Sequence, residues 1–230
     1  MSLNKKLAGW TTILSGIIAF ISYTLVAAAV NFNFEFFSDA TLIFSTEGVS
    51  SILLRWSMIT DIFGYYLLLL PVLFLIYEWM KTKTAWAEVF TTCGGIYIIA
   101  GAAGAAILGS AWPALLDKYQ AASPEQQEII RQNFETLALV IVNGIWNLLD
   151  ALMFGVWFIA FGFLLKKQHV FLGWFTLFTG LCSAFDFTGN MLGIKAIADT
   201  ALNLYLVLAP LWAIVFGVAL LRNPSLLKTN

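Results

Sequence analysis

Six long apolar stretches, separated by short polar segments, account for most of the chain. A helix needs about 20 apolar residues to cross the roughly 30 Å of hydrocarbon in a bilayer. Stretches of this length occupy residues 7–30, 51–79, 89–112, 137–165, 171–191 and 202–221. The pattern predicts an all-α fold, a polytopic transmembrane bundle of six helices that forms one domain over residues 1–230.

The composition indicates that lipid is the solvent. Hydrophobic residues make up 60% of the chain and charged residues 11%, whereas a soluble domain usually carries about 25% charged residues. The net charge of −1 gives no basic surface for nucleic acid. The only histidine, His169, is in a predicted loop, and Cys93 and Cys182 lie inside apolar stretches. We therefore expect neither a metal nor another cofactor.

Lysine and arginine gather on one side of a six-span arrangement. That side holds Lys5, Lys6, Lys81, Lys83, Lys166, Lys167, Arg222 and Lys228, and the other side holds Arg55, Lys118, Arg131 and Lys195. Cytoplasmic loops of membrane proteins carry the excess of these residues. The distribution predicts that both termini lie in the cytoplasm (N-in, C-in).

The first apolar stretch shares some features with a secretory signal peptide. It follows a basic start and contains three alanines at positions 27–29, which resemble a cleavage site. The apolar core of a signal peptide is usually about 7–15 residues long. This stretch is longer and contains Ser15 and Ser22. We therefore expect an uncleaved first span.

The connections on the side away from the termini are long. Residues 31–49 are rich in phenylalanine and interrupted by acids, which is typical of a segment at the lipid–water boundary. Ser123, Pro124 and Gln126 form a capping box, which predicts a helix start. The pattern allows this helix to continue into the fourth span with a bend at Asn143 and Gly144. Pro113 is expected to end the third helix.

The third span is rich in small residues. Its glycines are Gly94, Gly95, Gly101, Gly104 and Gly109. Small residues allow transmembrane helices to approach one another closely. We therefore assign this span a packing role and no chemistry.

Ionisable residues inside the spans are the strongest functional signal. Asp61, Asp150 and Asp186 fall inside three different spans, and Arg55 falls at the outer mouth of the second. Each charge at a helix centre costs about 2.5–3.5 kcal/mol on insertion scales, so such residues face protein or water. The predicted topology places all four in the outer half of the bundle or at its midplane. They suggest one shared polar cavity.

The fourth span presents one polar face. Its members, spaced i, i+3, i+4 and i+7, are Asn143, Trp146, Asn147 and Asp150, and Phe154, Trp157 and Phe161 continue the stripe inward. Such a face suits a site for an amphiphile or a ring compound. Asn and Asp also join transmembrane helices by hydrogen bonds. Both interpretations remain open.

Two other spans contribute polar faces. Asp61 and Tyr65 share one face, and Asp186 and Asn190 share another. Arg55 and Asp61 are six residues apart, about 240° around a helix, and therefore point in different directions. We expect Arg55 to pair with Asp186 or Asp150, or to lie among lipid headgroups. The candidate ligand-binding residues are Arg55, Asp61, Tyr65, Asn143, Trp146, Asn147, Asp150, Asp186 and Asn190.

Some of these segments resemble a known family. Residues 55–61 are similar to the start of the second helix in a bacterial six-helix membrane family described as domain of unknown function 4386. The run from Asn147 and Asp150 to Asp186 resembles the same family. The resemblance implies a six-helix fold in the bacterial cytoplasmic membrane, with Arg55, Asp61 and Asp186 matching the pattern and Asp150 and Trp146 matching it less closely. It implies no activity.

Three functions are compatible with the sequence. The first is binding or moving a small hydrophobic, amphiphilic or lipid-like ligand through a polar cavity in the outer half. The second is a structural or regulatory membrane subunit whose polar residues only join helices. The third is a membrane enzyme that uses two carboxylates about 5–9 Å apart; with no nucleophile–base pair evident, it is the least favoured. Membrane lipids are expected partners and nucleic acid is not, while the sequence leaves the oligomeric state undefined.

Overall fold

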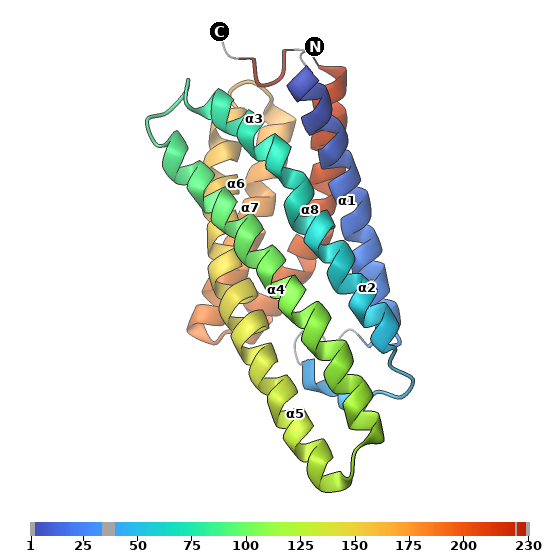
Figure 1. Cartoon of the computed structure of the whole chain (residues 1–230). Coiled ribbons are helices and arrows are strands. Elements are labelled where there is room, and N and C mark those ends of the chain that lie inside the picture. Colours follow the sequence, from blue (N-terminus) through green and yellow to red (C-terminus); the bar gives the residue numbers. More distant parts are fainter. Residues whose placement is uncertain (1–2, 34–39, 224, 229–230) are drawn as a thin grey trace.

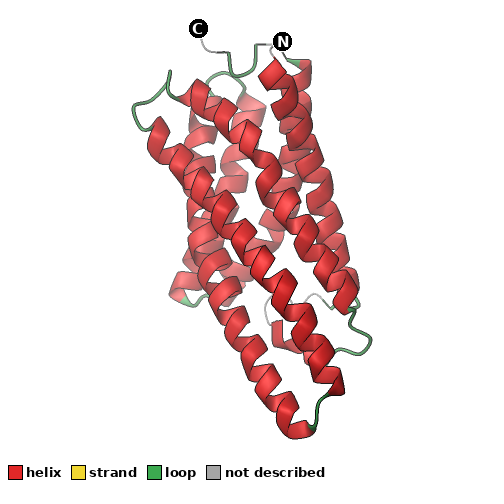
Figure 2. Cartoon of the chain, in the orientation of Figure 1, coloured by secondary structure: helices red, strands yellow, loops and turns green. Residues whose placement is uncertain are grey.

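The computed structural model describes residues 3–33, 40–223 and 225–228, which are mostly helical (Figure 2). The first span is α1 (Leu3–Ala29), and a short 3₁₀ helix, η2 (Ala40–Phe44), follows it. The other helices are α2 (Ser51–Asp61), η3 (Ile62–Tyr66), η4 (Leu67–Leu69), α3 (Leu70–Met80), α4 (Ala87–Ala121), α5 (Pro124–Ala138), η5 (Leu139–Asp150), α6 (Ala151–Leu165), α7 (Val170–Leu192) and α8 (Lys195–Arg222).

Six continuous helical stretches of the described chain are long and apolar enough to cross a membrane. They are Asn4–Ala29, Ser51–Met80, Ala87–Ala121, Pro124–Leu165, Val170–Leu192 and Lys195–Arg222. The predicted six-span, all-helical fold is therefore confirmed. Both chain ends lie at the same end of the bundle (Figure 1). Which side of the membrane that end faces stays a prediction.

The spans form a closed ring. Each span packs against the next one in sequence, and α8 returns to pack along α1 (Figure 1). Small residues make this closure possible: a Cβ on Gly9 would lie 2.7 Å from Leu221, and one on Gly217 would lie 2.7 Å from the carbonyl oxygen of Gly9. The ring brings polar residues from distant parts of the sequence to a common interior.

Two helices continue past the others at the end away from the termini (Figure 1). α4 has 35 residues and the α5–η5–α6 helix has 42, so they are about 50 and 60 Å long at 1.5 Å per residue. The expectation that Pro113 ends the third helix is wrong, because α4 continues to Ala121. Pro113 is buried between Trp112 and Leu116 in α4, and neighbouring helices of a bundle can support such a proline.

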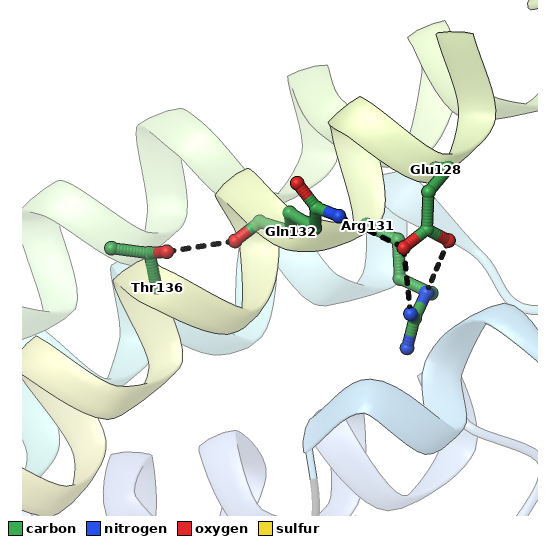
Figure 3. A network of polar contacts seen from close by, with 4 residues as sticks. All are labelled: Glu128, Arg131, Gln132 and Thr136. Atoms are coloured by element: carbon green, nitrogen blue, oxygen red, sulfur yellow. Dashed lines mark hydrogen bonds and ion pairs between the residues drawn. The ribbon is translucent and has the colours of Figure 1, made fainter. Parts of the chain in front are cut away.

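Exposed ion pairs mark the polar surface at each end of the bundle. On α5, Arg131 Nε and Nη2 donate to the two carboxylate oxygens of Glu128 at 3.0 and 2.9 Å (Figure 3). Both side chains are nearly half exposed, so this part of α5 lies in water or headgroups, because hydrocarbon would not solvate them. After α3, Lys81 Nζ lies 2.7 Å from Glu78. The hydrogen bond to Glu78 raises the pKa of Lys81.

The long connection before α2 is only partly described. Residues 34–39 lie outside the described residues, and they include Phe34, Phe36 and Phe37 of the predicted boundary segment. In the described part, η2 packs on the α4–α5 hairpin: Ile43 is buried, and the Phe44 ring lies 4.8 Å from that of Phe134. This part contacts protein rather than lying free at a lipid surface.

Candidate functional site

A cavity of about 220 Å³ lies inside the ring, in the half away from the termini. All six spans contribute to its wall, which no single helix face could build. Its polar lining residues are Ser22, Tyr23, Asp61, Tyr65, Tyr66, Trp112, Glu135, Asn143, Trp146, Asn147, Asp150, Ser183, Asp186 and Tyr205. Its volume is far above the roughly 10–15 Å³ that one water needs by a comparable measure.

Seven of the nine candidate residues line this cavity. They are Asp61, Tyr65, Asn143, Trp146, Asn147, Asp150 and Asp186. They come from the second, fourth and fifth spans, so the three aspartates share one interior space. Whether a ligand occupies that space stays a prediction.

The other two candidates lie elsewhere. Arg55 is exposed on the first turn and a half of α2, outside the cavity lining. The expected pairing of Arg55 with an acid of another helix is not present within the described residues, whose ion pairs are Lys81–Glu78 and Arg131–Glu128. Asn190 is not part of the lining but holds a lining residue: its Nδ2 donates to Asp186 Oδ1 at 2.8 Å.

Asp61 and Asp186 each accept a side-chain hydrogen bond. Ser22 Oγ of α1 lies 3.2 Å from Asp61 Oδ1 and 2.9 Å from the carbonyl oxygen of Ser57. Asn190 supplies the donor to Asp186 from one turn further along the same helix, α7. The Asp61 bond therefore joins α1 to α2, as the helix-joining interpretation expects, whereas the Asp186 bond lies within one helix.

Asp150 differs from the other two. Its side chain is buried, and Tyr66 donates a hydrogen bond to its Oδ2 at 3.3 Å. Its Oδ1 is buried and has no hydrogen-bond partner. Buried polar atoms in proteins are nearly always hydrogen-bonded, so Oδ1 is a buried acceptor that the described residues leave unsatisfied.

Irregular helical segments build the wall that holds Asp150. η5 is a π-helix over residues 139–150; it contains Asn143 and Gly144, where the bend stays a prediction. η3 is a shorter π-helix that carries Tyr65 and Tyr66. Such insertions are rare and often occur at functional sites. In η3 the wider turn lets two successive tyrosines face the interior together.

Sequence reasoning missed several lining residues. Tyr66, Tyr205 and Glu135 line the cavity but were not among the candidates. Tyr66 directly follows Tyr65, and a regular α-helix would turn it about 100° away. Tyr205 follows a polar first turn of α8 and carries no charge to mark it. A search for all tyrosines at the depth of Asp61 would have found both.

The small residues of α4 make room for cavity side chains. A Cβ on Gly101 would overlap the ring of Tyr66, and a Cβ on Gly104 would lie 2.6 Å from Trp146 Nε1. Trp146 Nε1 also donates to the carbonyl oxygen of Gly101 at 3.3 Å. The packing role expected of this span therefore determines where two cavity residues sit.

Hydrogen-bonded tyrosines form the floor of the cavity. Tyr97 OH donates to the carbonyl oxygen of Tyr65 at 2.8 Å and lies 2.9 Å from the hydroxyl of Tyr205, which donates to it. Tyr65 OH donates to the carbonyl oxygen of Leu206 at 2.8 Å. These bonds connect η3, α4 and α8 at one level.

Below the floor, toward the termini, lies a packed aromatic core. Phe154, Trp157 and Phe161 are buried in it rather than lining the cavity, which corrects the expectation that the stripe on the fourth span continues as a binding surface. Partners on α6 and α8 enclose them: the Phe158 ring lies 3.9 Å from Phe154 and 4.5 Å from Trp212. This core closes the cavity on the side of the termini.

The lining defines what the cavity can hold. None of its described lining residues is a lysine, arginine or histidine, so the protein supplies no cation to the aspartates. No group of three or more His, Cys, Asp or Glu residues in the described chain is placed to hold a metal ion. Apolar side chains, including Leu139, Val142 and Leu206, complete the wall. The surface suits a small molecule with an apolar part.

Comparison with known proteins returned no match, whether to a protein-family model, a curated protein or a solved structure. The resemblance to the bacterial six-helix family therefore stays a prediction. The function has to be argued from the cavity alone.

Proposed function

We propose that this multi-pass membrane protein binds or moves a small or lipid-like ligand through the acid-lined cavity. The observation that carries the proposal is a 220 Å³ space, bordered by all six spans, that combines three aspartates with apolar walls. Ligand sites typically have this character, mostly apolar with a few convergent polar groups. With both termini in the cytoplasm, the cavity belongs to the outer half of a bacterial cytoplasmic membrane.

A purely structural role accounts for less of the geometry. If the polar residues only joined helices, each buried polar atom would find a partner in a neighbouring helix. Asp150 Oδ1 has none, and Asn143 and Asn147 make no side-chain hydrogen bond within the described residues. The side chains of Asn143 and Asn147, which line the cavity, are free to bind a ligand.

The proposal is tested by thermal unfolding of the purified protein in detergent. Octanol, octylamine and octanoate share one chain length and differ in charge, so together they sample neutral, cationic and anionic amphiphiles. We expect at least one to raise the melting temperature in a saturable way, because a ligand that binds only the folded state stabilises it.

Two variants control for effects of the probes on the detergent. Asn147→Phe fills the cavity and should remove the stabilisation, whereas Arg55→Gln, outside the lining, should keep it. If none of the three probes stabilises the wild-type protein, or if Asn147→Phe responds like the wild type, the proposal is wrong.

A further inference from the structure

We propose that the ligand is an amphiphilic organic cation whose ammonium group pairs with Asp150. This inference rests on the proposed function and adds the chemical class of the ligand. Its starting point is the orphaned Oδ1 of Asp150, a buried carboxylate oxygen in the cavity wall. A buried aspartate keeps its charge only with a donor or a cation beside it, and otherwise binds a proton.

The cation has to come from outside the protein. No described lining residue carries a positive charge. Arg55, the basic residue of the second span, is exposed and is not among the residues that line the cavity. The hydrogen bond that Asp150 accepts from the Tyr66 hydroxyl is to the other carboxylate oxygen at 3.3 Å, so the described residues leave Oδ1 without a donor.

An organic ammonium group fits this space better than a bare metal ion. Metal ions such as Ca²⁺ require about six to eight oxygen ligands at 2.3–2.6 Å, and no described cluster of three or more acids, cysteines or histidines is placed to supply them. An ammonium group needs one carboxylate and is further stabilised by aromatic faces. Tyr66, Trp146 and Tyr205 line the same cavity.

The rest of the wall indicates that the cation carries an alkyl portion. Leu139, Val142, Leu202 and Leu206 line the cavity. Leu139 is exposed at the surface of the bundle, so the apolar side of the cavity reaches the lipid-facing surface there. The ammonium group would lie deep at Asp150, and the tail would extend toward η5 and the membrane.

The test compares octylamine with octanol on the wild-type protein and on matched variants, by ligand-induced shifts of the melting temperature. We expect octylamine to bind at least about tenfold more tightly than octanol, since hydrogen bonds to charged groups are stronger than neutral ones. Asp150→Asn, which keeps the shape and removes the charge, should reduce octylamine binding to the level of octanol. Asp117→Asn, an exposed position on α4 outside the lining, should leave it unchanged.

The outcomes separate this inference from the proposed function. Equal, saturable binding of octanol and octylamine to the wild type would overturn the cation assignment and leave the ligand cavity standing. Binding by none of the three probes would overturn both. If Asp150→Asn does not fold, Tyr66→Phe replaces it: loss of the hydroxyl should change octylamine affinity while octanol affinity stays the same, and an unchanged octylamine affinity would count against the assignment.

Discussion

At the scale of single residues, Gly101 and Gly95 show how much surroundings matter. Both are glycines of α4, yet a Cβ on Gly101 would overlap the Tyr66 ring, and a Cβ on Gly95 would meet nothing within 4 Å. Tyr66 in turn holds Asp150. Gly101 of α4 thus leaves room for the Tyr66 ring and fixes the position of the hydroxyl that binds the Asp150 carboxylate.

This difference gives a direct prediction. Gly101→Ala should destabilise the protein by about 1–3 kcal/mol, the usual cost of overpacking a tight interior, and displace Tyr66 from Asp150. Gly95→Ala should be neutral or slightly stabilising, because alanine favours a helix over glycine by about 1 kcal/mol. Thermal unfolding in detergent measures both. Equal melting temperatures for the two variants would contradict the contact between Gly101 and Tyr66.

The aspartates of the site could be predicted from sequence, but of their hydrogen-bond partners only Asn190 was. Asp61, Asp150 and Asp186 stand out because a carboxylate in hydrocarbon is expensive and must face an interior. Tyr66 and Tyr205 carry no such cost and look like ordinary aromatic residues of a membrane helix. The expected pairing of Arg55 with an aspartate is not found, because a charge at the mouth of a span costs little free energy wherever the side chain can reach water or headgroups.

At the scale of elements, the α4–α5 hairpin and η5 have opposite surroundings although both are exposed. Asn133 of α5 and Val140 of η5 lie seven residues apart and both expose their side chains. The exposed Glu128–Arg131 pair indicates that the α5 surface lies in water or headgroups, and from the apolar composition of η5 we expect Val140 to lie against lipid. Exposed side chains of this continuous helix are therefore expected to meet different surroundings, which are water or headgroups on α5 and lipid on η5.

Cysteine labelling can separate these two environments. In a chain whose Cys93 and Cys182 are replaced by alanine, Asn133→Cys should react rapidly with a membrane-impermeant maleimide. Val140→Cys should react far more slowly, because thiols in lipid are protonated and out of reach of the reagent. Similar rates at the two positions would mean that the membrane boundary does not lie between residues 133 and 140.

The existence of these elements was predictable from apolar length, but their internal irregularities were not. The capping box correctly marked the start of α5 at Pro124. The π-helical turns of η3 and η5 depend on contacts with other helices, which a local pattern does not contain. The prediction that Pro113 ends the third helix was wrong for the same reason, because the neighbouring helices, and not the geometry of the proline, decide whether α4 continues.

At the scale of the whole molecule, the direction of the bundle in the membrane decides which compartment the cavity serves. Both termini lie at the same end (Figure 1), and the lysine and arginine distribution assigns that end to the cytoplasm. A fluorescent reporter that matures only in the cytoplasm, fused to the C-terminus, should be bright in bacteria. A dark fusion, together with an active periplasmic phosphatase fusion at the same point, would reverse the orientation.

The closed ring also has a consequence for how the protein is made. α1 emerges from the ribosome first and α8 last, yet these two helices pack along each other. Until α8 arrives, the space that Leu202, Tyr205 and Leu206 will close is open, and Asp61 and Asp150 face whatever surrounds the nascent chain. The insertion machinery must therefore shelter these carboxyl groups for most of synthesis. A chain truncated before α8 would release them into lipid and become a target for membrane quality control.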